Sequence, residues 1–233
     1  MIPPSEDPLE EHGGIQINNL NSILHIDEDT QEEEDNLEFN LSEYFDLSNF
    51  SSYSTRNHNS INILSLNTNS IGKKIELIKL QMTKLKENHN FTVHIAAFQE
   101  CWLENENQIS QLNIDNYQMY YQLSKVGKSG GLVIYIHESL EAEEIPFFKD
   151  SPSKLWEGQT IQISADELNK PLFIHNIYRP PREKSRPGLF NSSREKHDIF
   201  LKEFDPYLDK INKQTPESII VGDLLQSPRN QLK

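Results

Sequence analysis

Short apolar runs and one periodic apolar stripe predict a strand, a helix and a second strand between residues 60 and 98. Residues 61–66 form a run rich in β-branched side chains that stops at the polar turn cluster 67–70, as a buried strand does. Apolar residues then recur at steps of three and four, which places them on one helical face: Ile71, Ile75, Ile78, Met82 and Leu85. Residues 93–98 are a second apolar run. The spacing predicts a parallel β-α-β crossover.

A second helix and more strands are predicted in the rest of the chain. The strands are predicted at four runs, residues 131–136, 155–163, 172–177 and 218–221. The connections between the first three runs favour antiparallel pairing, because a parallel return needs a dozen or more residues. Ser192 and Glu195 have the capping-box spacing of a helix start, and Pro206 is expected to bend that helix. The order of elements predicts a mixed α/β layered domain.

The first 56 residues have a different pattern. They hold 14 Asp and Glu against a single basic residue, Arg56, a net charge of −13, whereas residues 57–233 have a net charge of −1. Acidic runs with scattered single hydrophobic residues bury too little apolar surface to fold alone, which predicts a disordered tail or short segments that fold on a partner. Within it, residues 37–47 alternate acidic and hydrophobic side chains as protein-interaction segments do, so a protein partner of the tail stays open.

Composition excludes several classes of protein. Hydrophobic residues make up 35% of the chain, mean hydropathy is −0.67 and no apolar run is long enough to span a bilayer, so no membrane partner is expected. The N-terminus lacks the basic and apolar regions of a secretory signal. Cys101 is the only cysteine, which excludes an internal disulfide and a zinc site built from cysteines, and fits a reducing compartment.

Three polar residues follow predicted strands at the point where each strand ends: Asn67, Glu100 and Asp223. Strand ends on one side of a sheet are where α/β proteins assemble their sites. Two carboxylates and an amide that converge there would suit a hard, oxygen-preferring cation such as Mg²⁺. Taken singly, each has an ordinary explanation as the start of a turn, a cap or a turn residue.

Five short motifs carry more information about function than the positions of these strand-end residues do. They are NILSLN at residues 62–67, FQECWL at 98–103, GGLVIYI at 130–136, NIYRPP at 176–181 and IIVGD at 219–223. Together they resemble the apurinic-type endonuclease domain of non-LTR (LINE-like) retrotransposons, a branch of the endonuclease/exonuclease/phosphatase family. The resemblance divides the chain into the acidic tail (1–56), a partial domain (57–226) and a short C-terminal tail (227–233).

The resemblance implies a fold and a set of roles. The fold would be a four-layer α/β sandwich, in which two sheets pack face to face with helices outside. Glu100 matches the family's metal-holding glutamate and Asn67 the amide that supports metal and phosphate. Tyr178 matches the tyrosine that hydrogen-bonds near the scissile phosphate, and Asp223 the aspartate that orients or deprotonates the attacking water. Arg179, which follows in the same motif, is expected to bind substrate.

The implied activity is hydrolysis of phosphodiester bonds in DNA, with Mg²⁺, or Mn²⁺ in its place, as cofactor. A DNA partner would place the protein in the nucleus. Because the chain as a whole is acidic, contact with DNA requires a local basic surface. The one basic-leaning stretch is residues 179–196, which also reads as a solvated loop.

The sequence departs from the family pattern at its late motifs. The family's Gly-Asp-Phe-Asn reads Gly222-Asp223-Leu224-Leu225, so the amide is missing, and no Ser-Asp-His segment follows. We therefore expect a sandwich that is incomplete at its C-terminus, with an uncovered strand edge, and weak or no activity. The alternative is an inactive retroelement remnant that acts, if at all, through protein interaction. A phosphoinositide or sphingolipid phosphodiesterase fits the motifs less well.

Other candidate residues have simpler interpretations. Tyr178 without its Arg-Pro-Pro sequel would be a core aromatic at a strand end. The glycines of residues 127–131 lack the spacing of a phosphate-binding loop and indicate a tight turn. Cys101 has no histidine partner in the sequence, which argues against a thiol nucleophile. Trp156 and Glu157 fit strand positions better than catalytic ones.

Overall fold

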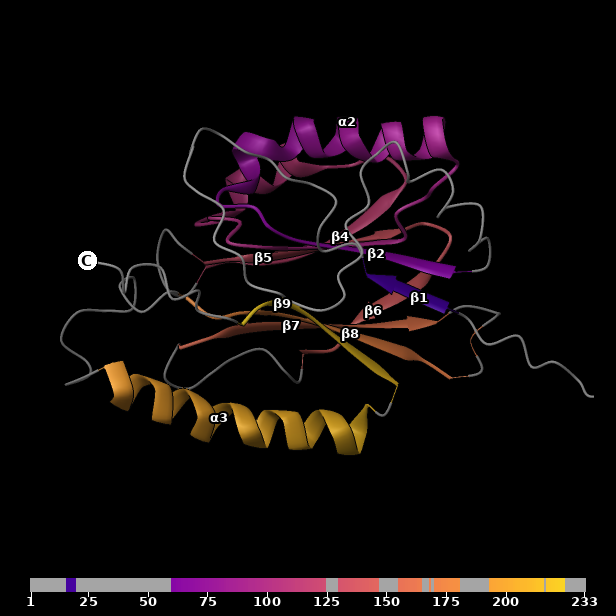
Figure 1. Ribbon diagram of the computed structural model, residues 1–233. Coiled ribbons are helices and arrows are strands. Elements are labelled where there is room, and N and C mark those ends of the chain that lie inside the picture. The colour runs from indigo at the N-terminus through magenta and orange to yellow at the C-terminus, as the bar shows by residue number, and fades with distance from the viewer. Residues whose placement is uncertain are drawn as a thin grey trace, which may run out of the picture.

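Two β-sheets lie face to face between two helices, so the molecule has four layers (Figure 1). The computed structural model describes residues 16–19, 60–124, 130–146, 155–164, 168, 170–180, 193–215 and 217–224. Helix α2 (Ile71–His89) covers the outer face of the first sheet, and helix α3 (Ser193–Gln214) covers the outer face of the second. The predicted four-layer α/β sandwich is confirmed, whereas the predicted domain boundaries stay predictions.

The first sheet has the strand order β1-β2-β3-β5-β4. Its strands are β1 (Gln16–Asn19), β2 (Ser60–Asn67), β3 (Ile95–Gln99), β4 (Tyr117–Gln122) and β5 (Leu132–His137). The β2 and β3 strands are parallel and joined by α2, as predicted, while β5 pairs antiparallel with both β3 and β4. A short 3-10 helix, η1 (Glu106–Leu112), lies between β3 and β4.

The second sheet has the strand order β6-β7-β8-β9. Its strands are β6 (Glu141–Glu144), β7 (Glu157–Ser164), β8 (Leu172–Tyr178) and β9 (Ser218–Asp223). The first three strands are antiparallel, and β9 runs parallel to β8 after the crossover through α3. Among the described residues, β9 pairs with β8 alone, so its other side is a sheet edge.

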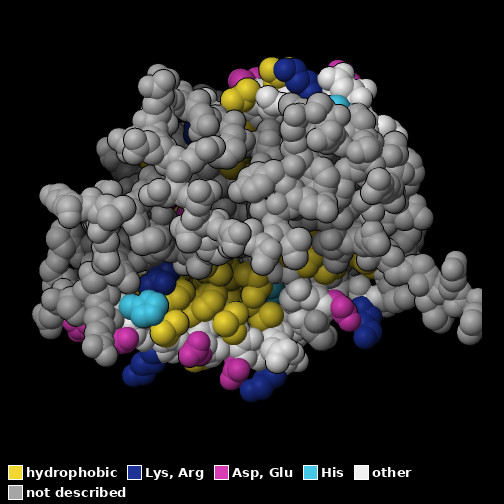
Figure 2. All heavy atoms as spheres, viewed as in Figure 1, with side chains coloured by type: hydrophobic (Ala, Val, Ile, Leu, Met, Phe, Trp, Pro, Cys, Tyr) yellow, Lys and Arg dark blue, Asp and Glu magenta, His cyan; other side chains and the backbone are white. Residues whose placement is uncertain are grey.

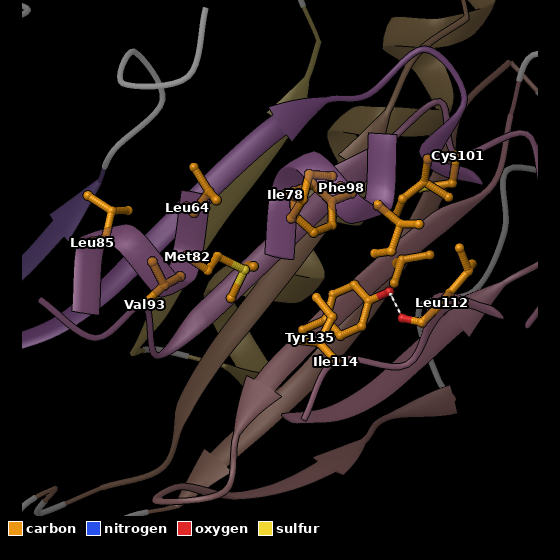
Figure 3. Packing of buried hydrophobic residues seen from close by; sticks show 14 of the residues in the cluster. Leu64, Ile78, Met82, Leu85, Val93, Phe98, Cys101, Leu112, Ile114 and Tyr135 are labelled. Carbon is orange, nitrogen blue, oxygen red and sulfur yellow. Dashed lines mark hydrogen bonds between the residues drawn. The ribbon is translucent and has the colours of Figure 1, made fainter. Parts of the chain in front are cut away.

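Three hydrophobic cores separate the four layers. The central strands of the first sheet are largely apolar because alternate residues face different cores. In β2, Leu64 packs in the core under α2, while Ile61 and Ile63 pack between the two sheets. Figure 3 shows the core under α2, where Phe98 meets the face of the helix and the Tyr135 hydroxyl donates to the Leu112 carbonyl at 2.6 Å.

The third core lies between α3 and the second sheet. It contains the aromatic residues of α3, with Trp156 packed edge-on to Phe204 at 5.6 Å between ring centroids. Figure 2 shows hydrophobic side chains gathered alongside α3 and charged side chains along its outer face. Pro206 lies inside the helix, and the bend expected there stays a prediction. The predicted cap residue Ser192 falls outside the described residues. In the part of the chain that the structure describes, no helix combines the length and apolar content needed to cross a membrane.

The predicted tail needs one correction. Residues Gln16–Asn19 form β1, which pairs parallel with β2 from Gln16 opposite Ser60 to Asn19 opposite Ile63. These four residues therefore have regular structure, and disorder in the rest of the tail stays a prediction. Backbone hydrogen bonding explains the difference, because the edge of β2 offers unpaired amide and carbonyl groups to any extended segment, whatever its side chains. The proposed interaction segment 37–47 lies outside the described residues.

A buried histidine on the second sheet makes the fold sensitive to acid. His175 is fully buried among hydroxyl groups, with Thr160 Oγ1 3.0 Å from Nδ1 and Ser218 Oγ 3.2 Å from Nε2. Burial lowers the pKa of His175 from 6.5 to about 4. Between these two values the unfolded chain binds the extra proton, so stability rises with pH through this window and is lost as pH falls.

We expect His175→Asn to weaken this acid dependence. Wild-type protein should lose roughly 2–3 kcal/mol of unfolding free energy through this group between pH 6.5 and pH 4. Asparagine does not titrate, so the variant should have a flatter slope while other groups contribute equally to both proteins. Urea unfolding of both proteins at a series of pH values measures the difference. Parallel curves for the two proteins would contradict the assignment.

Candidate active site

Four residues predicted from the motifs meet where four strands end. Asn67 is the last residue of β2, and Glu100 directly follows β3. Tyr178 and Asp223 are the last residues of β8 and β9 and lie opposite each other in the strand register. Each pair of strands is parallel, so each sheet delivers two of these side chains to the same end.

Hydrogen bonds join the four side chains across the two sheets. The Asn67 amide nitrogen donates to Glu100 Oε1 at 3.1 Å and to Asp223 Oδ2 at 2.9 Å. The Tyr178 hydroxyl donates to the same Glu100 oxygen at 2.9 Å. Glu100 is 6% exposed, whereas Asn67 and Asp223 are half-buried. The cluster is therefore a pair of carboxylates held by one amide and one phenol at a partly open strand end.

The orientation of the Asn67 side chain is fixed by its other contact. Its oxygen accepts the backbone N–H of Asn69 at 3.2 Å, so its nitrogen faces the two carboxylates. In this orientation Asn67 organises the carboxylates, and its oxygen does not face them.

The backbone at Glu100 has an unusual conformation. Glu100 has φ 50° and Trp102 has φ 56°, in the left-handed region that side-chain-bearing residues seldom adopt. Backbone hydrogen bonds hold this segment, including Ser70 N–H to the Glu100 carbonyl at 2.8 Å. Strained residues that persist in a fold cluster at functional sites, which makes this segment a site candidate on grounds independent of the motifs.

Burial and the neighbouring Glu100 raise the pKa of Tyr178 above its usual range. Tyr178 therefore keeps its proton and acts as a hydrogen-bond donor to Glu100. Burial also raises the pKa of the Cys101 thiol, which agrees with the expectation that it is not a nucleophile. The sequence interpretation of Tyr178 as a phosphate contact stays a prediction.

Tyr178→Phe is expected to weaken the site and the fold together. The substitution keeps the ring in its buried position but removes the donor to the buried Glu100 carboxylate. A hydrogen bond to a charged group contributes about 1.5–3 kcal/mol, so the unfolding free energy should fall by that amount. Urea unfolding at pH 7 measures it. An unchanged unfolding midpoint would show that the hydroxyl adds nothing to the placement of Glu100.

The side chain of Arg179 lies against α3. Its guanidinium carbon is 3.8 Å from the centroid of the Phe200 ring, and Nη2 is 3.2 Å from His197 Nδ1. Its backbone N–H donates to the Asp223 carbonyl at 2.9 Å, which fixes the end of β9. The substrate-binding role of Arg179 therefore stays a prediction. All the other basic residues between 182 and 196 fall outside the described residues or have undescribed side chains.

Sequence reasoning missed a polar bridge beneath the site. Gln99 Nε2 donates to Asn176 Oδ1 at 2.6 Å, and Asn176 Nδ2 donates to the Phe98 carbonyl at 3.1 Å. Both residues are buried, and the pair joins the two sheets next to Glu100 and Tyr178. The signal was available, because a polar residue inside an otherwise apolar buried strand needs a partner. Glu157, interpreted only as a strand residue, is also buried and lies opposite Tyr178 in the strand register.

The residues present fit a hard divalent cation on chemical grounds. Mg²⁺ in proteins is commonly bound by one or two carboxylates and completes its shell with water and substrate phosphate. Glu100 with Asp223 supplies such a pair. Among the described residues, no group of three or more His, Cys, Asp or Glu side chains is placed to hold a metal. A cation here would therefore depend on Glu100 and Asp223 and on oxygens from solvent or substrate.

No protein-family model matches the chain, and no curated protein matches it. Solved structures with a similar fold include D. rerio TDP2 complexed with a single strand DNA product, at 14% identity and a TM-score of 0.44 over 72% of this chain and 62% of that chain. The Xenopus laevis APE2 catalytic domain matches at 18% identity and a TM-score of 0.47, over 71% of this chain and 58% of that chain.

A third similar structure is the mannosyl-6-phosphatase Bt3783 of Bacteroides thetaiotaomicron VPI-5482. It matches at 12% identity and a TM-score of 0.47, over 70% of this chain and 65% of that chain. The chain spans less than two thirds of the length of each of these three solved chains.

Proposed function

We propose that this protein is a weak, Mg²⁺-dependent phosphodiester hydrolase that acts on DNA, of the retrotransposon endonuclease type. The observation that carries the proposal is the hydrogen-bonded cluster of Asn67, Glu100, Tyr178 and Asp223, built from both sheets. The same four residues belong to four of the five ordered motifs that resemble this family.

Each residue has a chemical role that its contacts support. A bound Mg²⁺, or Mn²⁺, would supply positive charge against the charge that develops on the phosphate in the transition state. Glu100 would be its principal protein ligand, and the Tyr178 hydroxyl holds the Glu100 carboxylate in place. Asp223 orients the attacking water and accepts its proton. Asn67 holds the two carboxylates at a fixed separation, since one nitrogen donates to both.

The choice of DNA as substrate rests on the motifs, because the cluster itself would serve any phosphodiester. FQECWL and NIYRPP resemble the retroelement branch more than the lipid phosphodiesterases. The activity is expected to be weak because Leu225 stands where the family has the asparagine that helps hold water and phosphate. An inactive remnant that acts through protein contacts is the competing function.

Nicking of supercoiled plasmid by the full chain, in Mg²⁺ and in EDTA, tests the proposal. We expect slow nicking in Mg²⁺, none in EDTA, and a fall of about 10² in rate for Asp223→Asn. Asp209→Asn, an exposed aspartate of α3, is the matched control and should leave the rate unchanged. The same protein should not hydrolyse a phosphoinositide or sphingomyelin vesicle.

Three outcomes would oppose the proposal. Equal nicking by wild type and Asp223→Asn indicates a contaminating nuclease. A folded wild type that neither nicks DNA nor is stabilised by Mg²⁺ supports the remnant. Hydrolysis of the lipid but not of the plasmid would keep the chemistry and replace the substrate.

A further inference from the structure

A third carboxylate is buried beside the proposed site. Glu157 is the first residue of β7, is 1% exposed and lies opposite Tyr178 in the β7–β8 register. Burying a carboxylate is costly unless specific groups compensate it, so a buried carboxylate seldom lacks a structural or functional role. The surroundings of this side chain therefore indicate what it does.

The Glu157 carboxylate is held against a pair of glycines. Its Oε2 accepts the backbone N–H of Gly131 at 2.7 Å. A Cβ atom on Gly130 would lie 2.5 Å from Glu157 Oε1, so the absent side chain at this glycine is what lets the carboxylate approach. Gly131 has φ 92°, a conformation that glycine adopts without strain.

The same two glycines hold the segment that carries Glu100. The Gly131 carbonyl accepts the N–H of Cys101 at 3.0 Å, and the Gly130 carbonyl accepts the N–H of Trp102 at 2.8 Å. These two amides directly follow Glu100, in the stretch where Glu100 and Trp102 have positive φ. A continuous set of contacts thus runs from the Glu157 carboxylate through the glycines to the backbone of Glu100.

We propose that Glu157 is a positioning residue that holds Glu100 in its left-handed conformation through the Gly130-Gly131 loop. Its carboxylate holds the backbone of Gly131 in place. The carbonyls of Gly130 and Gly131 in turn hold the two amides that follow Glu100. Glu157 acts on the site through the backbone and does not itself bind the cation. The consequence for cation binding rests on the proposed function; the consequence for the backbone does not.

Two substitutions separate the hydrogen bond from the charge. Glu157→Met keeps the approximate volume of the side chain and removes the acceptor, whereas Glu157→Gln keeps an acceptor oxygen and removes the charge. Glu141→Gln, an exposed glutamate of β6, is the matched control. The full chain is used in each case, because β1 from its N-terminal part pairs with β2.

Amide hydrogen exchange by NMR measures the positioning directly, without any cation. In Glu157→Met we expect the amides of Gly131, Cys101 and Trp102 to exchange about ten times faster or more. Gly131 loses its hydrogen bond to the carboxylate, and the glycine carbonyls that accept from Cys101 and Trp102 are no longer held in place. The amide of Ile174 in the core of β8 should keep its rate. Glu157→Gln should stay within about threefold of wild type, and Glu141→Gln should match it.

Calorimetric titration with Mg²⁺ alone measures the consequence for the site. Glu157→Met should bind Mg²⁺ about 10–100 times more weakly than wild type, as is usual when a residue that orients a ligand is lost, and Glu157→Gln should recover most of the affinity.

The two measurements test different claims. Unchanged exchange at Cys101 and Trp102 in Glu157→Met would overturn the positioning role, whatever the cation does. If wild type does not bind Mg²⁺, the proposed function is overturned. The amide exchange rates then still test the positioning role of Glu157. If Glu157→Met does not fold, Gly130→Ala takes its place, because the added Cβ displaces the same carboxylate. It should produce the same pattern of faster exchange, and wild-type rates in it would overturn the inference.

Discussion

Replacing Glu100 with glutamine is expected to lower Mg²⁺-dependent nicking by about 10²–10³ and to remove stabilisation by Mg²⁺. Glutamine keeps an oxygen that accepts from Asn67 and Tyr178, so the hydrogen-bonded cluster persists. What disappears is the negative charge that would attract the cation. Because the charge is buried at 6% exposure, the variant without metal should be at least as stable as wild type.

Thermal unfolding with and without Mg²⁺, together with plasmid nicking, measures both effects of Glu100→Gln. Glu87→Gln, an exposed glutamate of α2, is the control and should behave as wild type. If Mg²⁺ raises the melting temperature of Glu100→Gln as much as that of wild type, the cation binds elsewhere. If the variant also nicks at the wild-type rate, Glu100 has no role in the chemistry.

Replacing Gly222 with alanine is expected to destabilise the protein by about 3 kcal/mol or more and to abolish the site. A Cβ atom at this position would lie 1.8 Å from the Ile177 carbonyl oxygen, and φ is 136°. A side-chain movement cannot relieve the clash, because the atoms in the way belong to the backbone of the neighbouring strand. The end of β9 must move away from β8, and Asp223 moves with it.

Gly72→Ala is the matched control for the Gly222 substitution. Gly72 lies in the first turn of α2, and a Cβ atom there would meet nothing within 4 Å. Alanine at a compatible helical position should stabilise by about 0.4–1 kcal/mol, because it restricts the unfolded chain. We therefore expect urea unfolding to show a lower unfolding free energy for Gly222→Ala and a higher one for Gly72→Ala, each relative to wild type. Stability of Gly222→Ala equal to wild type would mean that β9 does not approach β8 as described.

Central strands could be predicted from the sequence, and most edge strands could not. The strands β2, β3 and β5 are largely apolar because helices and sheets cover both of their faces, and β7 and β8 combine apolar residues with buried polar ones. By contrast, β1, β4 and β6 lie at sheet edges, and three of the four residues of β6 are glutamate. Pairing with a neighbouring strand, rather than side-chain preference, places these residues in extended conformation.

The site was predictable as a set of residues but not as a geometry. Asn67, Glu100 and Asp223 could be chosen because each follows a strand, and Tyr178 because of its motif. That one amide nitrogen serves both carboxylates depends on how two sheets dock, and Asn67 and Asp223 are 156 positions apart. Local patterns do not encode that docking. For the same reason, the bridge between Gln99 and Asn176 and the contact of Glu157 with Gly131 became visible only in three dimensions.

The four residues of the cluster are divided between two sheets, so any chemistry at the site depends on how these sheets pack against each other. Asn67 and Glu100 belong to one sheet, and Tyr178 and Asp223 to the other. Among the described residues, β9 is paired on one side only. Its fraying would carry Asp223 away while the core between α2 and the first sheet stayed intact. Such a partial opening needs less free energy than global unfolding. Activity should therefore decline on warming before circular dichroism reports any loss of structure.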